Sequence, residues 1–213
     1  MRNALLSVIV LAAIATAGCT SLERSRALGD PAVPAQSIAM QVCSNCHGVD
    51  GNSVSPNFPK LAGQTEAYLT DQLKEFRNHR RADPAGFEYM WGLSRHLSDD
   101  QIVGLASYYA AQKPAGPTDL DGTPSVRGQA LFENGAPDKG IPACNGCHGT
   151  EGQGNDKFPR IANQHADYLV KQLMVFQRTD ERPEGAIMKT VAHELTVDDM
   201  AQVARFLEAM PVK

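Results

Sequence analysis

The sequence has no dense run of basic residues, no apolar segment of membrane-spanning length and no cysteine to spare. Lys and Arg are scattered along the 213 residues and the formal net charge is −4, so nucleic-acid binding has little support. The one long apolar run, residues 4–14, is too short for a comfortable membrane span. The remaining composition, 42% hydrophobic and 21% charged, is ordinary for a globular protein and argues against disorder.

The N-terminal segment has the layout of an export signal. Arg2 precedes the apolar run, and small residues follow it. An Ala-Thr-Ala sequence fits ordinary signal peptidase, whereas the Ala-Gly-Cys that ends at Cys19 resembles a bacterial lipobox with Thr16 in place of the usual Leu. We favour cleavage before Cys19, so that residues 1–18 are a signal peptide and residues 19–35 are a flexible tether. This predicts a periplasmic protein that is anchored to the membrane by a lipid on Cys19.

The cysteines occupy two kinds of position. Cys19 lies in the export segment, and the others form two Cys-x-x-Cys-His runs, CSNCHGVDG at 43–51 and CNGCHGTEG at 144–152. No cysteine is left for a structural disulfide, although the protein is predicted to be exported. One kind of task therefore accounts for the four cysteines of the mature domains, which are Cys43, Cys46, Cys144 and Cys147.

The two runs belong to a longer internal repeat. Residues 58–76 align without gaps to 158–176, and residues 90–110 correspond to 188–208. The first pair shares Phe-Pro, Tyr-Leu, Gln-Leu and single Ala and Gln positions. A segment rich in Pro, Gly and Asp separates the copies and is typical of a linker. The predicted order is a first domain at 36–112, a linker at 113–124 and a second domain at 125–213.

Each copy is predicted to be helical. Apolar residues recur at helical spacing after each Phe-Pro, and strict strand alternation is not evident. The last helix of each copy begins with a capping box, Ser98 with Gln101 and Thr196 with Asp199. The fold class is therefore all-α, with two tandem domains. Because a domain of roughly 80 to 90 residues built from short helices has a thin core, we expect a large apolar group to fill it.

Four kinds of chemistry were considered for the cysteine pairs: a redox-active dithiol, a zinc site, disulfides and covalent haem attachment. A dithiol redox site needs a βαβ context, which is missing. A zinc site that joins both pairs would need closer spacing, since they lie about a hundred residues apart. Disulfides would not explain the histidine that follows each pair. Covalent haem attachment explains both, because the thiols add to the haem vinyl groups and His47 or His148 then lies under the iron. The sequence therefore predicts two covalently bound haem c groups.

The opposite side of each iron needs another ligand. Met90 and Met188 occupy matching positions, each seven residues before the Leu that precedes the last helix. Methionines without a Met counterpart fit a core role instead. Surface positions are expected for the histidines without a His counterpart, namely His79, His96, His165 and His193. The predicted axial pairs are His47 with Met90, and His148 with Met188.

With these motifs the chain resembles the tandem class I cytochromes c of the dihaem cytochrome c₄ type. The resemblance rests on two Cys-x-x-Cys-His-Gly runs, each followed by Phe-Pro, a Tyr-Leu-x-x-Gln-Leu helix and a late Met, and it extends from residue 36 to the C-terminus. It implies two packed cytochrome c domains with electrons passing between their haems. It also implies that the carbonyls of Pro59 and Pro159 accept a hydrogen bond from the histidines under the irons. It suggests haem propionate partners among the arginines, which are Arg80, Arg81 and Arg182.

His/Met ligation leaves no open position on the iron and raises its reduction potential, so the predicted function is one-electron transfer without substrate chemistry. The resemblance implies a respiratory chain in which a cytochrome bc-type complex is the donor and a terminal oxidase, or a similar protein, is the acceptor. The slightly acidic charge favours partners with a basic docking patch. One alternative is an electron-entry subunit of a larger dehydrogenase or oxidase complex. Another is a dihaem peroxidase, which needs an iron with a vacant or displaceable site.

Overall fold

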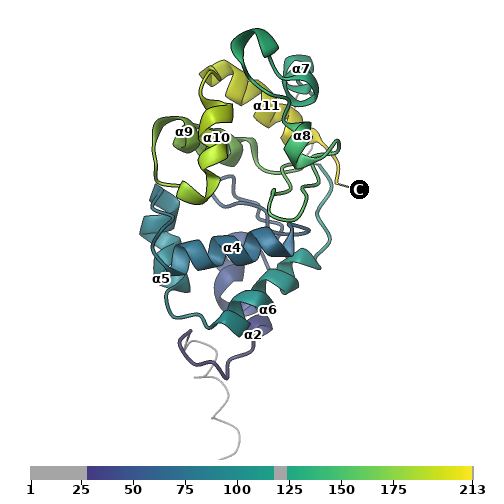
Figure 1. The fold of residues 1–213 in the computed structure, drawn as a ribbon. Helices are drawn as coiled ribbons and strands as arrows, with labels where there is room; N and C mark the ends of the chain where they lie inside the picture. The colour runs from purple at the N-terminus through teal and green to yellow at the C-terminus, as the bar shows by residue number, and fades with distance from the viewer. Residues whose placement is uncertain (1–27, 118–123, 213) are drawn as a thin grey trace, which may run out of the picture.

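The computed structural model describes residues 28–117 and 124–212 of the chain. The predicted signal peptide, the predicted lipidation site Cys19 and parts of the predicted tether and linker lie outside these residues. Within them the chain is helical, with isolated bridges only at Ala136–Ile141 and Asn155–Phe158. The all-α prediction is confirmed. Figure 1 shows two helical domains stacked end to end, the first in blue and teal and the second in green and yellow.

The two domains repeat the same order of elements. The first domain contains α2 (Ala35–Ile38), η2 (Ala39–Cys43), α3 (Ser44–His47), α4 (Glu66–Arg77), η3 (Gly86–Met90), α5 (Trp91–Ser94) and α6 (Asp99–Ala110). The second contains α7 (Val126–Asn134), η4 (Pro137–Lys139), α8 (Asn145–His148), α9 (Ala166–Arg178), η5 (Pro183–Gly185), α10 (Ala186–Ala192) and α11 (Val197–Ala209). No helix of the described ranges has both the length and the apolar character needed to cross a bilayer.

Both last helices begin with the predicted capping boxes. The Ser98 hydroxyl accepts a hydrogen bond from the Gln101 backbone N–H, and the Gln101 side chain accepts one from the Ser98 N–H. Thr196 and Asp199 make the same exchange at the start of α11. Two otherwise unpaired N–H groups at each helix start are thereby satisfied.

The first and last helices cross closely in both domains, but the glycine that permits the contact lies on the first helix in one domain and on the last helix in the other. A Cβ at Gly128 on α7 would lie 2.0 Å from the backbone oxygen of Gln202 on α11. In the first domain the close contact is made by Gly104 on α6, where a Cβ would lie 2.6 Å from Cβ of Ala35. Gly104 stands at the repeat position of Gln202. Each crossing therefore needs one residue without a side chain, supplied by opposite helices.

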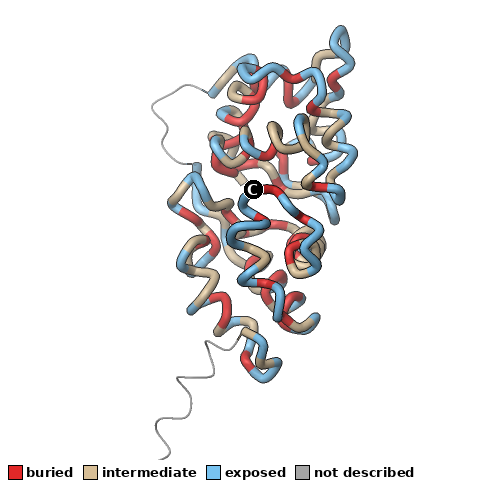
Figure 2. Tube along the Cα trace, turned by 90° about the vertical axis from the view of Figure 1, so that its left-hand side faces the viewer, coloured by how far each residue is buried: buried red, intermediate tan, exposed pale blue. Residues whose placement is uncertain are grey.

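Small apolar clusters form the interior of each domain. In the first domain, Ile38, Leu69 and Ile102 join the first helix to α4 and α6. In the second domain the buried residues divide into two groups, one around Phe132 and one around Met200. Figure 2 shows buried and exposed positions alternating along the helices of both domains. These apolar clusters are small, as expected for domains of this size.

The domains meet through polar contacts, one of which corrects a sequence prediction. The backbone N–H of Ala82 donates to the carbonyl of Glu181 at 2.8 Å. His165, expected on the surface, is only 6% exposed, and its Nε2 lies 2.9 Å from the Ser53 carbonyl of the first domain. The prediction was wrong because no sequence pattern marked this face as covered by the other domain. The other unmatched histidines, His79, His96 and His193, are exposed as predicted.

Candidate haem sites

Each Cys-x-x-Cys-His run forms a single helical turn. Cys43 ends η2, and Cys46 and His47 lie on α3; in the second domain Cys144 directly precedes α8. Cysteines three residues apart therefore lie on one turn of helix. No disulfide joins Cys43, Cys46, Cys144 and Cys147. The structure thus presents two thiols and an imidazole together in each domain.

The cysteine environment differs from that of a redox-active dithiol. Burial raises the pKa of Cys43 to about 11, and the pKa of Cys144 to about 11. A catalytic dithiol instead lowers the pKa of its nucleophile to expose a thiolate. In the described part of the chain, no group of three or more His, Cys, Asp or Glu side chains could hold a metal ion. The raised pKa of these cysteines therefore does not favour the dithiol alternative.

Each histidine is held by the carbonyl of a proline. Nδ1 of His47 donates to the Pro59 carbonyl at 2.9 Å, and Nδ1 of His148 donates to the Pro159 carbonyl at 2.8 Å. Because a carbonyl only accepts, Nδ1 must carry the proton and Nε2 keeps its lone pair. Burial lowers the pKa of both imidazoles, although the bond to the proline carbonyl acts in the opposite direction. Both rings are thus neutral and oriented, as an iron ligand requires.

The phenylalanine of each Phe-Pro pair packs against the same histidine. The ring of Phe58 meets that of His47 edge-on, with centroids 6.2 Å apart, and Phe158 meets His148 with centroids 6.3 Å apart. This Phe is part of the sequence repeat, but the sequence pattern did not predict its contact with the histidine. Its recurrence directly before the proline was the available signal. The Phe-Pro pair therefore restrains the imidazole twice, by packing and by a hydrogen bond.

The two candidate methionines lie on matching segments with different local structure. Met90 ends the π-helical turn η3, whereas Met188 lies within α10. Both are half-buried. Their role as iron ligands remains a prediction.

Apolar side chains beside these methionines fit a large apolar group. Phe87 and Tyr89, next to Met90, are 59% and 58% exposed, and Ile187, next to Met188, is 62% exposed. Single exposed apolar residues such as Ile187 are normal, but the pair Phe87 and Tyr89 beside Met90 is typical of a ligand-binding face. Two thiols, an imidazole with a free Nε2 and a thioether form a suitable donor set for haem c. The residues present therefore fit the group in both domains.

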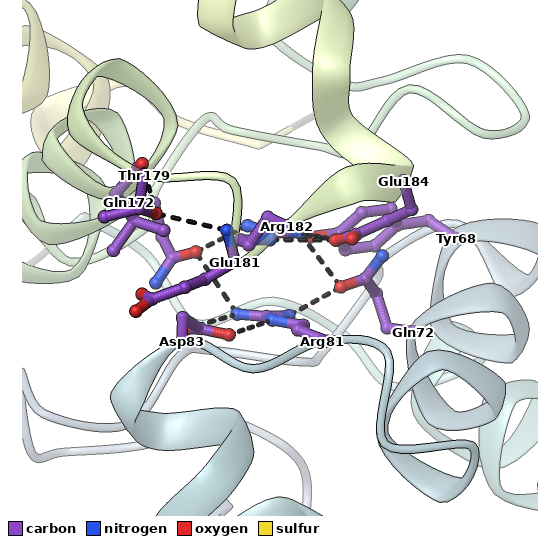
Figure 3. A network of polar contacts seen from close by, with 10 residues as sticks. Tyr68, Gln72, Arg81, Asp83, Gln172, Thr179, Glu181, Arg182 and Glu184 are labelled. Atoms are coloured by element: carbon purple, nitrogen blue, oxygen red, sulfur yellow. Dashed lines mark hydrogen bonds and ion pairs between the residues drawn. The ribbon is translucent and has the colours of Figure 1, made fainter.

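Buried arginines lie between the two domains. Figure 3 shows Arg81 of the first domain and Arg182 of the second close together, with the side chains of Gln72 and Gln172 accepting from both. Arg81 also pairs with Asp83, and Arg182 with Glu184. Arg80, in contrast, is exposed and pairs with Glu75. Of the three arginines suggested as propionate partners, two thus make contacts across the domain interface.

Together, the helical cysteine turns and the proline-bound histidines define a c-type cytochrome with two haem domains. The sequence profile of the family named Cytochrome c matches residues 32–111 and 125–211. The chain belongs to the cytochrome c family, with two covalently bound haem c groups in domains of the cytochrome c₄ type.

Three relatives illustrate the match. A cytochrome c₄ of Pseudomonas aeruginosa is 36% identical over 95% of this chain and 98% of its own length. The solved structure of Acidithiobacillus ferrooxidans cytochrome c₄ has a TM-score of 0.74 and 38% identity, and covers 78% of this chain and 97% of the other. A thiosulfate dehydrogenase electron acceptor of Thiomonas intermedia is 34% identical over 80% of this chain and 79% of its own length. The chain is an electron-transfer protein rather than an enzyme.

Proposed function

We propose that this dihaem electron carrier works in the periplasm, tethered through Cys19, between a cytochrome bc-type donor and a terminal oxidase or similar acceptor. The observation that carries the proposal is the duplicated donor set, because neither domain lacks its histidine or its methionine. Two equivalent sites favour a carrier over a peroxidase, which needs one accessible iron.

The proposed residue roles are the same in both domains. Cys43 and Cys46 would hold the first haem covalently, and Cys144 and Cys147 the second. His47 with Met90, and His148 with Met188, would fill the axial positions. When bound, haem c supplies one-electron chemistry between Fe(III) and Fe(II). A Met sulfur on the iron would favour the reduced state, and an iron that is held by both His and Met would leave no position for oxygen or peroxide.

The domain interface supports this function by holding the two sites in one relative position. Arg81 and Arg182 share the carbonyl oxygens of Gln72 and Gln172, so each arginine is bonded to both domains. Such a buried and fully bonded network resists opening, because separation would leave polar groups unpaired. A constant separation between the two haems favours repeated electron transfer through the same path.

A second candidate role is to accept electrons from a periplasmic dehydrogenase. It is favoured by the similarity to the thiosulfate dehydrogenase electron acceptor of Thiomonas intermedia. This role uses the same two sites and differs only in the protein that supplies the electron.

Reduction kinetics of the oxidised holoprotein test both roles. The protein would be mixed with quinol and a purified cytochrome bc complex, and separately with thiosulfate and a purified thiosulfate dehydrogenase. Fast reduction by the first system, followed by oxidation by a terminal oxidase, is the expected result. Fast reduction by the dehydrogenase alone would establish the second role. No reduction by either would overturn both partner assignments.

A further inference from the structure

Two glutamines, one from each domain, make matching hydrogen bonds to the backbone of the opposite domain. Oε1 of Gln164 accepts from the backbone N–H of Lys60 at 2.8 Å, and its Nε2 donates to the Lys60 carbonyl at 2.9 Å. Gln64 does the same to Arg160, with distances of 2.6 Å and 2.9 Å. Both glutamines are buried. They occupy the same position of the repeat, so each domain uses this glutamine to bind the backbone of one residue in the other domain.

The residue that the glutamine binds, Lys60 or Arg160, directly follows the proline whose carbonyl accepts from the histidine. The N–H of Lys60 and the carbonyl of Pro59 belong to one peptide group, which accepts from His47 at its oxygen and donates to Gln164 at its nitrogen. In the second domain the same peptide group joins Pro159 to Arg160. Each histidine is therefore connected, through a single peptide group, to a glutamine of the opposite domain.

Hydrogen bonds arranged in such a chain polarise one another. An acceptor on the peptide N–H makes the carbonyl oxygen a stronger acceptor for the imidazole N–H. A stronger bond at Nδ1 gives the imidazole more negative charge, which stabilises Fe(III) over Fe(II) and lowers the reduction potential.

We propose that Gln164 and Gln64 are positioning residues that set the reduction potential of the haem in the opposite domain. Gln164 acts on the first haem through His47, and Gln64 acts on the second through His148. The inference rests on the proposed ligation of the irons by these histidines. It makes each potential depend on the intact interface, and not on one domain alone.

The test uses Gln164→Met and Gln64→Met in the full-length holoprotein. Methionine has a similar length and flexibility but cannot accept the peptide N–H in the same way. The Arg160 side chain also donates to the carbonyls of Lys60 and Ala62, at 3.2 Å and 3.0 Å, so this loop keeps other support when Gln164 is changed. A redox titration followed by NMR, with the haem methyl signals assigned to each domain, measures both potentials separately.

The expected pattern is crossed. Gln164→Met raises the potential of the first haem and leaves the second unchanged, and Gln64→Met does the reverse. The control Asn57→Ala removes another cross-domain bond, from the Lys171 Nζ at 2.9 Å, and changes neither potential. An unchanged potential, an equal change in both haems or a change in the glutamine's own domain would overturn the inference.

Two further measurements separate this result from a failure of the proposed ligation. In Gln164→Met the Lys60 amide exchanges with solvent faster, which does not depend on iron; an unchanged rate would overturn the inference. His47→Ala loses the spectrum of a fully ligated first haem if His47 is the ligand. Retention of that spectrum would refute the ligation itself, whereas its loss together with uncrossed potentials would refute only the glutamine roles.

Discussion

Arg81 and Asp83 form an ion pair that is buried on both sides, with Nε of the arginine 2.8 Å from Oδ1 of the aspartate. Their side chains are 4% and 1% exposed. Burial alone would raise the pKa of Asp83, but Arg81 and Arg182 hold it below its ordinary value. The pair lies where Arg81 reaches Gln172 of the second domain at 3.2 Å. Both groups therefore remain charged inside the domain interface, each dependent on its partner.

Replacing Arg81 with Leu is expected to destabilise the protein strongly. The change leaves the Asp83 carboxylate buried and unpaired, a situation that costs about 3–5 kcal/mol. The free energy of unfolding in denaturant measures the loss. The neighbouring Arg80→Leu is the control, because that exposed pair with Glu75 contributes about 0–1 kcal/mol. Similar losses in both variants would contradict the importance of the buried pair.

Protonation of Asp199 is expected to destabilise the second domain in acid, whereas the matching position of the first domain cannot titrate. Burial would raise the pKa of Asp199, but its bonds to Thr196 and Arg127 outweigh this and lower the pKa below the ordinary value. Its contribution is therefore complete above the ordinary pKa and disappears as the pH falls through the lowered one. The corresponding residue of the first domain is the neutral Gln101.

Unfolding measured at a series of acidic pH values tests this difference. The variant Asp199→Gln, which copies the first domain, keeps the capping box but removes the ion pair with the half-exposed Arg127, so it should lose about 0–1 kcal/mol at neutral pH. Its stability should then vary less with pH below the ordinary carboxylate pKa than that of the parent protein. An unchanged slope in that range would show that Asp199 does not titrate as expected.

Removing a proposed axial methionine should open one iron at a time. Met90→Ala is expected to let carbon monoxide bind the reduced first haem, and Met188→Ala the second, because each leaves one axial position free. Optical spectra with and without carbon monoxide measure this, together with the Met–iron band of the oxidised protein. Met40→Ala, which changes a 47% exposed methionine near Cys43, is the control and should keep both bands. Carbon monoxide binding to the parent protein would instead favour the peroxidase alternative.

The proposed lipid anchor at Cys19 gives a prediction about the location of the protein. Cys19→Ser should move the protein from the membrane fraction to the soluble periplasmic fraction, since the acyl chain is the only proposed attachment. Immunoblots of fractionated cells measure the distribution, and unchanged haem staining shows that the domains still assemble. A parent protein already found in the soluble fraction would indicate cleavage by ordinary signal peptidase.

The sequence by itself determined the domain repeat, the helical class and the family, because these depend on short-range patterns. A Cys-x-x-Cys-His turn and a capping box such as Ser98 with Gln101 each lie within a few residues, so their spacing alone predicts their geometry. The repeat then identified Met90 and Met188 as equivalent candidates without any knowledge of their surroundings. Their ligand role still awaits the test above.

Only the tertiary structure decided how the domains use their shared residues. His165 was expected on the surface and is buried, and Arg81 and Arg182 meet between the domains. Gln64 and Gln164 each bond to the backbone of the opposite domain. These contacts join residues about a hundred positions apart, for which no local periodicity exists. The helix crossing is likewise a tertiary contact. It requires a residue without a side chain, which is Gly128 on the first helix of the second domain but Gly104 on the last helix of the first domain.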